Sequence, residues 1–170
     1  MKFEYKHLLP GYFDENARVW IYQSSRIFTV SEALQIEDML KDLVVNWQIH
    51  GTLVKSYANL FFGQFIVLMA DENVAGVSGC SIDSSVRVIQ QIEQQFNVEM
   101  FNWQSLAFVV NEKVQIIPRQ QFNYALENNF VTPQTIFFNN VVSTKKELEE
   151  KWMIPVGESW LKTKIKTVTQ

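Results

Sequence analysis

The chain has 170 residues, of which 47% are hydrophobic and 19% are charged, a composition typical of a globular protein built as one domain. A domain of this length buries roughly 70% of the surface of its unfolded chain, so it needs neither a disulfide nor a structural metal. The formal charge of −3 disfavours a nucleic-acid-binding protein. No long apolar run and no signal-like leader occurs, so we expect neither membrane insertion nor secretion and place the protein in the cytoplasm.

The first half of the chain predicts a strand, a helix and a hairpin. We expect a single domain over 1–170, with an irregular N-terminal segment over 1–16 whose aromatic residues pack against the rest of the domain. Aromatic and β-branched residues predict a strand at 18–23. Thr29 and Glu32 form a capping-box pattern before apolar residues at helical spacing, and Gly51 predicts the end of that helix. Strands at 54–62 and 64–70 follow, with Gly63 as the tight turn.

The second half adds another helix, another hairpin and short elements. An amphipathic helix runs from about Ser81 to Phe96. Strands at 106–110 and 114–117 predict a hairpin, and Pro118 starts a short helix. Residues 134–138 form a last strand, and Thr144 with Glu147 repeats the capping-box spacing before a short helix. Residues 161–170 read as a loosely ordered tail or an edge strand.

The order strand, helix, strand, strand, helix, strand is that of a split βαβ unit. We therefore predict an α+β fold in which an antiparallel sheet carries its helices on one face. Its ferredoxin-like core would be extended by an added hairpin strand and short C-terminal helices.

Cys80 lies at the most unusual stretch of the sequence, the serine-rich opening of the second helix. A helix N-terminus favours negative charge and can lower the pKa of a thiol, so Cys80 is a candidate nucleophile or redox-active residue. His50 is its candidate base, although the split βαβ order places the two residues at opposite ends of like-directed helices. The alternative is that Cys80 is a small buried residue before a capped helix.

The same helix opening offers a second candidate site, for a small anion. Backbone N–H groups with the hydroxyls of Ser81, Ser84 and Ser85 would hold a phosphate or carboxylate. Asp83 argues against this interpretation, because its carboxylate already interacts favourably with the helix dipole and would repel a second anion.

A third candidate site is the loop that starts at Phe138. Asn139 and Asn140, followed by Lys145, offer amides and a cation for a polar ligand, and capping of the loop explains these residues equally well. The tryptophans could line a pocket or an oligomer contact. We expect Trp20 and Trp47 in the core, and Trp152 and Trp160 either holding the C-terminal segment to the body or forming a partner surface.

Catalytic motifs are absent from the sequence. It contains no P-loop, dinucleotide-binding, nucleophile-elbow or zinc-protease pattern, so we expect no cofactor and no metal. The favoured hypothesis is a non-enzymatic module that binds a protein partner or a small polar ligand, with self-association into a homo-oligomer as one form of partnership. A cysteine-dependent enzyme or redox protein is the first alternative, and an anion-binding protein is the second.

Four stretches resemble a bacterial family of uncharacterised proteins, over roughly residues 17–160. They are Val19–Gln23, Trp47 with His50 and Gly51, Ser78–Ser85, and Phe138–Trp152. Members of that family are often labelled "ABC transporter ATPase", a label that this sequence does not support because the phosphate-binding loop is missing. The resemblance implies a bacterial, cytoplasmic protein and draws attention to the Cys80 segment, and it carries over no catalytic residue.

Overall fold

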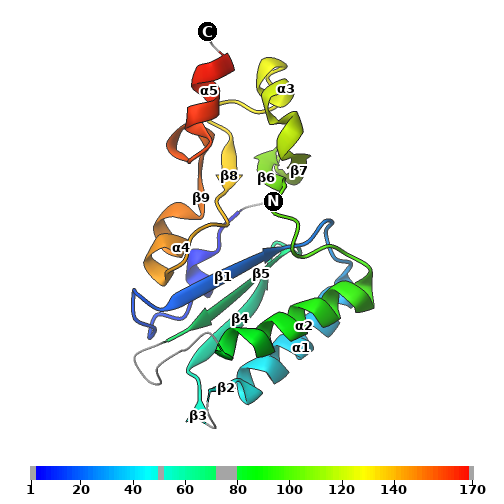
Figure 1. Ribbon diagram of the computed structural model, residues 1–170, viewed down its shortest axis with the longest axis vertical. Coiled ribbons are helices and arrows are strands. Elements are labelled where there is room, and N and C mark those ends of the chain that lie inside the picture. Colours follow the sequence, from blue (N-terminus) through cyan, green and yellow to red (C-terminus); the bar gives the residue numbers. More distant parts are fainter. Residues whose placement is uncertain (1–2, 50–51, 72–79, 169–170) are drawn as a thin grey trace.

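Two antiparallel sheets form the framework of the computed structural model, which describes residues 3–49, 52–71 and 80–168 (Figure 1). The first sheet has the strand order β1-β5-β4 and the second has the order β7-β6-β8-β9. Strands of the first sheet are β1 (Arg18–Gln23), β4 (Ser56–Phe61) and β5 (Phe65–Ala70). Strands of the second sheet are β6 (Ser105–Val110), β7 (Lys113–Pro118), β8 (Ile136–Phe138) and β9 (Met153–Pro155). The predicted α+β class is confirmed.

Helices α1 (Val30–Asn46) and α2 (Cys80–Phe96) lie side by side against one face of the first sheet (Figure 1). Their apolar stripes bury Ile36, Leu40, Ile89 and Ile92 against strand residues such as Leu68. An amphipathic helix is stabilised mainly by burying such a stripe. The expectation that both long helices share one face of an antiparallel sheet is therefore confirmed.

Helix α1 begins at the predicted capping box. The Thr29 hydroxyl accepts from the N–H of Glu32, and the Glu32 carboxylate accepts from the N–H of Thr29. The Arg26 guanidinium donates two hydrogen bonds to that carboxylate, at 2.8 and 2.9 Å. These hydrogen bonds, that of Arg26 first, lower the pKa of Glu32 to about 2.

Helix α1 ends at Asn46, so the predicted end at Gly51 is wrong. Trp47 takes an extended conformation, and its carbonyl accepts from the N–H of Val54 at 3.0 Å. This bend brings the Trp47 ring into the core, where 1% of the residue is exposed. A short strand, β2 (Gln48–Ile49), replaces the predicted last turn of the helix and pairs with a second short strand, β3 (Thr52–Leu53).

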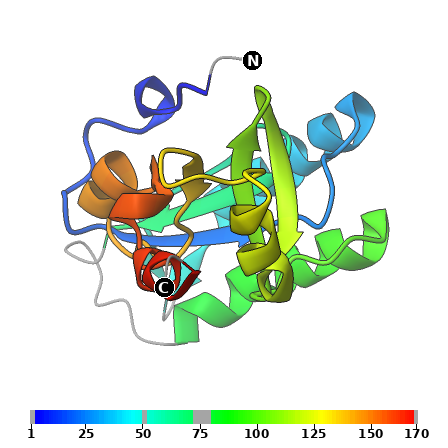
Figure 2. The same ribbon diagram turned by 90° about the horizontal axis from the view of Figure 1, so that it is seen from above.

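The opposite face of the first sheet is covered by the N-terminal segment, α4 (Lys145–Lys151) and the second sheet. Tyr5, Leu9 and Phe13 are buried here, and the 3-10 helix η1 (Lys6–Leu8) lies between Tyr5 and Leu9. Figure 2 shows this segment on the opposite flank of the molecule from α2. The Tyr5 hydroxyl donates to the carbonyl of Leu148 in α4 at 2.6 Å, which ties the segment to α4.

Aromatic rings join the two sheets. Phe65 of β5 stacks on Phe138 of β8 with ring centroids 4.4 Å apart, and the fully buried Trp152, at the end of α4, contacts Tyr5 edge-on at 4.8 Å. Aromatic pairs in such geometries stabilise a core beyond the area they bury. Trp152 thus lies at the centre of the contact between the sheets.

Both predicted hairpins are present, and each turns on residues with positive φ. Phe62 and Gly63 (φ 54° and 64°) join β4 to β5, and Asn111 and Glu112 (φ 51° and 59°) join β6 to β7. Two successive residues with positive φ suit the right-handed twist of a hairpin. Asn and Gly adopt this conformation at low cost, which is why these turns are visible in the sequence.

The second sheet carries its own short helices on the side away from the first sheet (Figure 1). These are η2 (Arg119–Gln121), α3 (Phe122–Glu127), η3 (Val156–Glu158) and α5 (Lys162–Val168). The prediction of a loose tail or edge strand after residue 161 differs from this structure. Leu161 is fully buried and Ile165 packs on the same cluster, so the last described residues form a docked helix.

Strand β6 does not lie where the split βαβ prediction places it. In that unit a fourth strand lies beside β1, whereas β6 pairs with β7 and β8 in the second sheet. The segment before α4 takes part of the vacated position: Arg18 bridges Thr144, and the N–H of Val19 donates to the carbonyl of Ser143 at 2.9 Å. The predicted split βαβ, ferredoxin-like core is therefore not formed as a whole: β1, α1, β4, β5 and α2 follow the predicted order, and in the described part of the chain the next strand, β6, does not pair with β1.

None of the helices in the described part of the chain has the length and apolar character needed to cross a bilayer.

Candidate ligand-binding site

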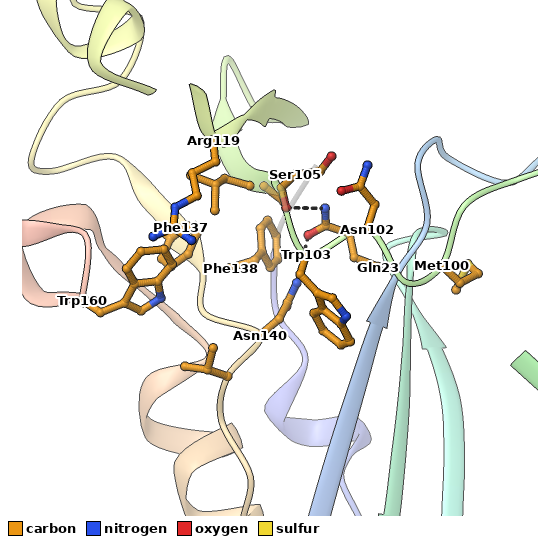
Figure 3. Close-up of a pocket in the computed structure, with 13 residues that line it drawn as sticks. Gln23, Met100, Asn102, Trp103, Ser105, Arg119, Phe137, Phe138, Asn140 and Trp160 are labelled. Carbon is orange, nitrogen blue, oxygen red and sulfur yellow. Dashed lines mark hydrogen bonds between the residues drawn. The ribbon is translucent and has the colours of Figure 1, made fainter. Parts of the chain in front are cut away.

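A cavity of about 230 Å³ lies where the first sheet meets the second (Figure 3). Its floor is apolar and buried, and its rim is mainly polar and aromatic. The lining residues of the floor are Met100, Leu106, Ala107, Phe137 and Phe138, and those of the rim are Gln23, Asn102, Trp103, Ser105, Arg119, Asn140, Val141 and Trp160. An apolar hollow with a few convergent polar groups is the usual form of a small-molecule site.

A chain of hydrogen bonds crosses the cavity wall and holds its amides in place. The Gln23 side chain donates from Nε2 to the carbonyl of Ser105 at 3.2 Å and accepts at Oε1 from Nδ2 of Asn140 at 2.9 Å. Oδ1 of Asn140 accepts from the indole N–H of Trp152 at 3.0 Å. These bonds also fix which atoms of the two amides are oxygen and which are nitrogen. The chain connects β1, β6 and the end of α4, so both sheets determine the shape of the site.

Arg119 is the only charged residue among the described residues that line the cavity. Its position is set by its own N–H, which donates to the carbonyl of Gln104 at 2.7 Å where β7 ends. Its guanidinium carbon lies 5.3 Å from the centroid of the Trp160 ring, within the reach of a cation–π contact. No salt bridge to Arg119 occurs in the described part of the chain.

Trp160 and Trp103 stand at the rim on different sides of Asn140 (Figure 3). The buried Ser159 places Trp160: its hydroxyl donates to the carbonyl of Val156 and accepts from the N–H of Leu161. Trp103 belongs to the link between α2 and β6 and is 64% exposed. An exposed indole beside a cavity offers a flat apolar face to a ligand.

The predicted site at the Phe138 loop is divided by the structure. Asn140 lines the cavity. Asn139 is buried and donates from Nδ2 to the carbonyl of Lys151, and its Oδ1 has no hydrogen-bond partner within the described residues. Lys145 is also buried, with its ammonium 2.9 Å from the carboxylate of Glu149. Only Asn140 is therefore placed where a ligand in this cavity would meet it.

The predicted sites around Cys80 fall largely outside the described residues. His50 is not described, and Cys80, Ser81 and Asp83 belong to the first turn of α2 with side chains outside the described part. Ser84 is exposed beside a hollow between α1 and α2. Ser85 is buried.

Gln23, Arg119 and Asn102 were missed by sequence reasoning. Gln23 ends a strand and Arg119 follows a proline, so their local context is that of ordinary boundary residues. The available signal was aromatic: Trp103 and Trp160 lie outside the strong helices and strands, where exposed indoles are typical of binding surfaces. Trp20 is partly buried against the core and Trp47 is fully part of it, as expected, while Trp152 holds the C-terminal half to the body.

Within residues 3–49, 52–71 and 80–168, no three His, Cys, Asp or Glu side chains come together as a metal site requires. The donors at the cavity are amides, a hydroxyl, indoles and a guanidinium, which suit an organic ligand better than a cation.

Comparisons with protein-family models, with curated proteins and with solved structures find no match for this chain.

Proposed function

We propose that this protein is a cytoplasmic, non-enzymatic binding module whose cavity takes a small organic carboxylate with a planar or apolar body. The observation that carries the proposal is Arg119, a guanidinium without an ion pair in the described part of the chain, held over Trp160 at the mouth of an apolar hollow. Guanidinium binds carboxylates through paired hydrogen bonds. Arg119 is the only charged residue in the described lining of the cavity, so the local charge there favours an anion although the chain as a whole carries a formal charge of −3.

The rest of the lining supports a ligand with both apolar and polar parts. Phe137 and Phe138 form an apolar floor, and Trp103 offers an exposed ring at the rim. The amides of Gln23 and Asn140 are already bonded to each other, so they form a fixed polar wall. The volume corresponds to about eight water molecules of liquid, which limits the buried part of the ligand to something close to a benzyl or indolyl group.

Binding of N-acetylphenylalanine, compared with its carboxamide, tests the proposal. Titration followed by ¹⁵N NMR should shift the indole N–H signals of Trp103 and Trp160 and the side-chain amide of Asn140. We expect the acid to bind at least about tenfold more tightly than the amide, which corresponds to about 1.4 kcal/mol. Arg119→Gln should abolish that preference.

Arg87→Gln is the matched control, because it removes the same charge from an exposed position of α2 that does not line the cavity. It should leave the preference for the acid unchanged. Equal binding of acid and amide to the unmodified protein, or shifts confined to residues away from the cavity, would refute the proposal.

A further inference from the structure

A second hollow, of about 390 Å³, adjoins the cavity along strand β1. The two share Trp103 and Asn140 in their linings. The described residues that line the second hollow are Arg18, Val19, Trp20, Ile21, Tyr22, Val86, Phe101, Trp103, Asn140, Val142 and Ser143. Five consecutive residues of β1 therefore face this hollow, and the next residue, Gln23, lines the cavity.

The edge of β1 that faces these hollows has unused hydrogen-bonding groups. Since the N–H of Val19 bonds to Ser143, away from β5, the alternation of an antiparallel pair directs the N–H and C=O of Ile21 to the same free side. Ile21 has no further hydrogen bond in the described part of the chain. An unpaired strand edge of this kind accepts an added strand.

The unpaired stretch of this edge is bounded at both ends by residues that already form hydrogen bonds on the same side. Val19 bonds to Ser143, and the N–H of Ser25, just beyond the strand, donates to the carbonyl of Glu99 at 2.9 Å. Five residues lie between Val19 and Ser25, so the two are six steps apart along the strand, about 20 Å at the rise of a β-strand. This short stretch is where the fourth strand of a split βαβ unit would lie. It suits a few residues of extended chain, and a chain that ends there avoids the closure at Ser25.

The charges along the edge have one sign. Arg18 is the only charged residue among the described lining of the second hollow, as Arg119 is for the cavity, and no carboxylate lines either. Arg119 lies at the Gln23 end of the edge, together with Trp160. At this end, the terminal carboxylate of a peptide would contact Arg119, and a large terminal side chain would contact Trp160.

We propose that the two hollows together bind the C-terminal end of another polypeptide as an added strand on β1. This inference rests on the proposed function, since it assigns the carboxylate at Arg119 to a peptide C-terminus. The terminal side chain lies in the cavity between Trp103 and Trp160, and the preceding residues run back along β1 toward Arg18, parallel to it. Main-chain hydrogen bonds to Ile21 then supply affinity, and the cavity supplies specificity.

The test compares ligands of different length and backbone on the intact protein, by calorimetry and by ¹⁵N NMR. The ligands are N-acetylphenylalanine, acetyl-Ala-Ala-Phe with a free carboxylate, its carboxamide, and two acetyl-Ala-Ala-Phe variants that are each N-methylated at one alanine. We expect the tripeptide to bind at least tenfold more tightly than N-acetylphenylalanine and to shift the backbone N–H signal of Ile21. The carboxamide, and the N-methylated peptide that loses the bond to Ile21, should each lose about tenfold.

The outcomes separate this inference from the proposed function. If N-acetylphenylalanine binds at Arg119 and the tripeptide binds no more tightly, the strand-addition inference is wrong and the proposed function stands. If the tripeptide binds tightly but both N-methylated forms bind equally well, main-chain pairing is refuted. If no ligand with a free carboxylate binds, both are refuted. Modifying the ligand leaves the protein unchanged, so none of these outcomes depends on the folding of a variant.

Discussion

Replacing Asn140 with alanine removes the centre of the hydrogen-bond chain at the cavity. The variant breaks the bond from Trp152 at 3.0 Å and the bond to Gln23 at 2.9 Å. Trp152 is fully buried, so its indole N–H is left with poor access to water as a substitute. Gln23 is half-buried and can recover part of its loss from solvent.

The expected cost follows from these two environments. A buried donor left without a partner costs about 1–3 kcal/mol, and a partly exposed hydrogen bond contributes about 1 kcal/mol. We therefore expect Asn140→Ala to lower the free energy of unfolding by about 2–3 kcal/mol. For a chain of this length, 1 kcal/mol corresponds to about 2–4 °C, so the Tm should fall by about 4–12 °C.

Urea unfolding followed by far-UV circular dichroism measures this change. Asn46→Ala is the control: that asparagine is exposed and bonds only to a carbonyl of its own helix, so its loss should change the free energy by no more than about 0.5 kcal/mol. Asn140→Asp keeps an oxygen acceptor for Trp152 and should cost less than the alanine variant. Its carboxylate should also weaken binding of an anion at Arg119. A loss below about 0.5 kcal/mol for Asn140→Ala, at an unchanged urea dependence, would refute the role assigned to this chain of hydrogen bonds.

Three further changes test the fold. The pKa of Glu32 is lowered to about 2 from a reference of 4.5, so its carboxylate stabilises the fold above about pH 4.5 and loses that effect as the pH falls toward 2. In urea titrations, the Glu32→Gln variant should be less stable than the unmodified protein at neutral pH and equally stable near pH 2. A difference in stability that does not depend on pH would contradict this. Gly63→Ala places a Cβ at a residue with φ 64° and 3.2 Å from Cγ1 of Ile27, and should cost about 1–2 kcal/mol in thermal unfolding, whereas an unchanged Tm would show that the turn relaxes. Leu161→Ala should cost about 2–5 kcal/mol because the side chain is fully buried, and a change below about 1 kcal/mol in chemical denaturation would mean that α5 is not docked as described.

Local patterns in the sequence determined most of the elements. The pairing of Thr29 with Glu32 located the start of α1, because a capping box needs only residues three apart. Apolar spacing located α2, and the turns at Gly63 and Asn111 located both hairpins. Each of these signals depends on neighbours along the chain, which is why each could be read without knowledge of the fold.

Tertiary contacts decided how those elements combine. The apolar residues of β6 suit any sheet edge, and nothing local directs β6 to β8 and away from β1. Trp47 left the helix because its ring is needed in the core, and strand β9 is too short to be predicted without its partner β8.

The candidate site is formed entirely by tertiary contacts. Gln23, Arg119 and Asn140 come from three distant parts of the sequence, and they meet only because β6 to β9 fold as a separate sheet over the first one. The same choice leaves the Ile21 edge of β1 open. Sequence alone thus established what each segment of this protein is, through short-range hydrogen bonding and periodic burial. The pairing of distant strands determined where a ligand can bind. That pairing could not be predicted locally, because strands pair through backbone groups that are the same in every segment.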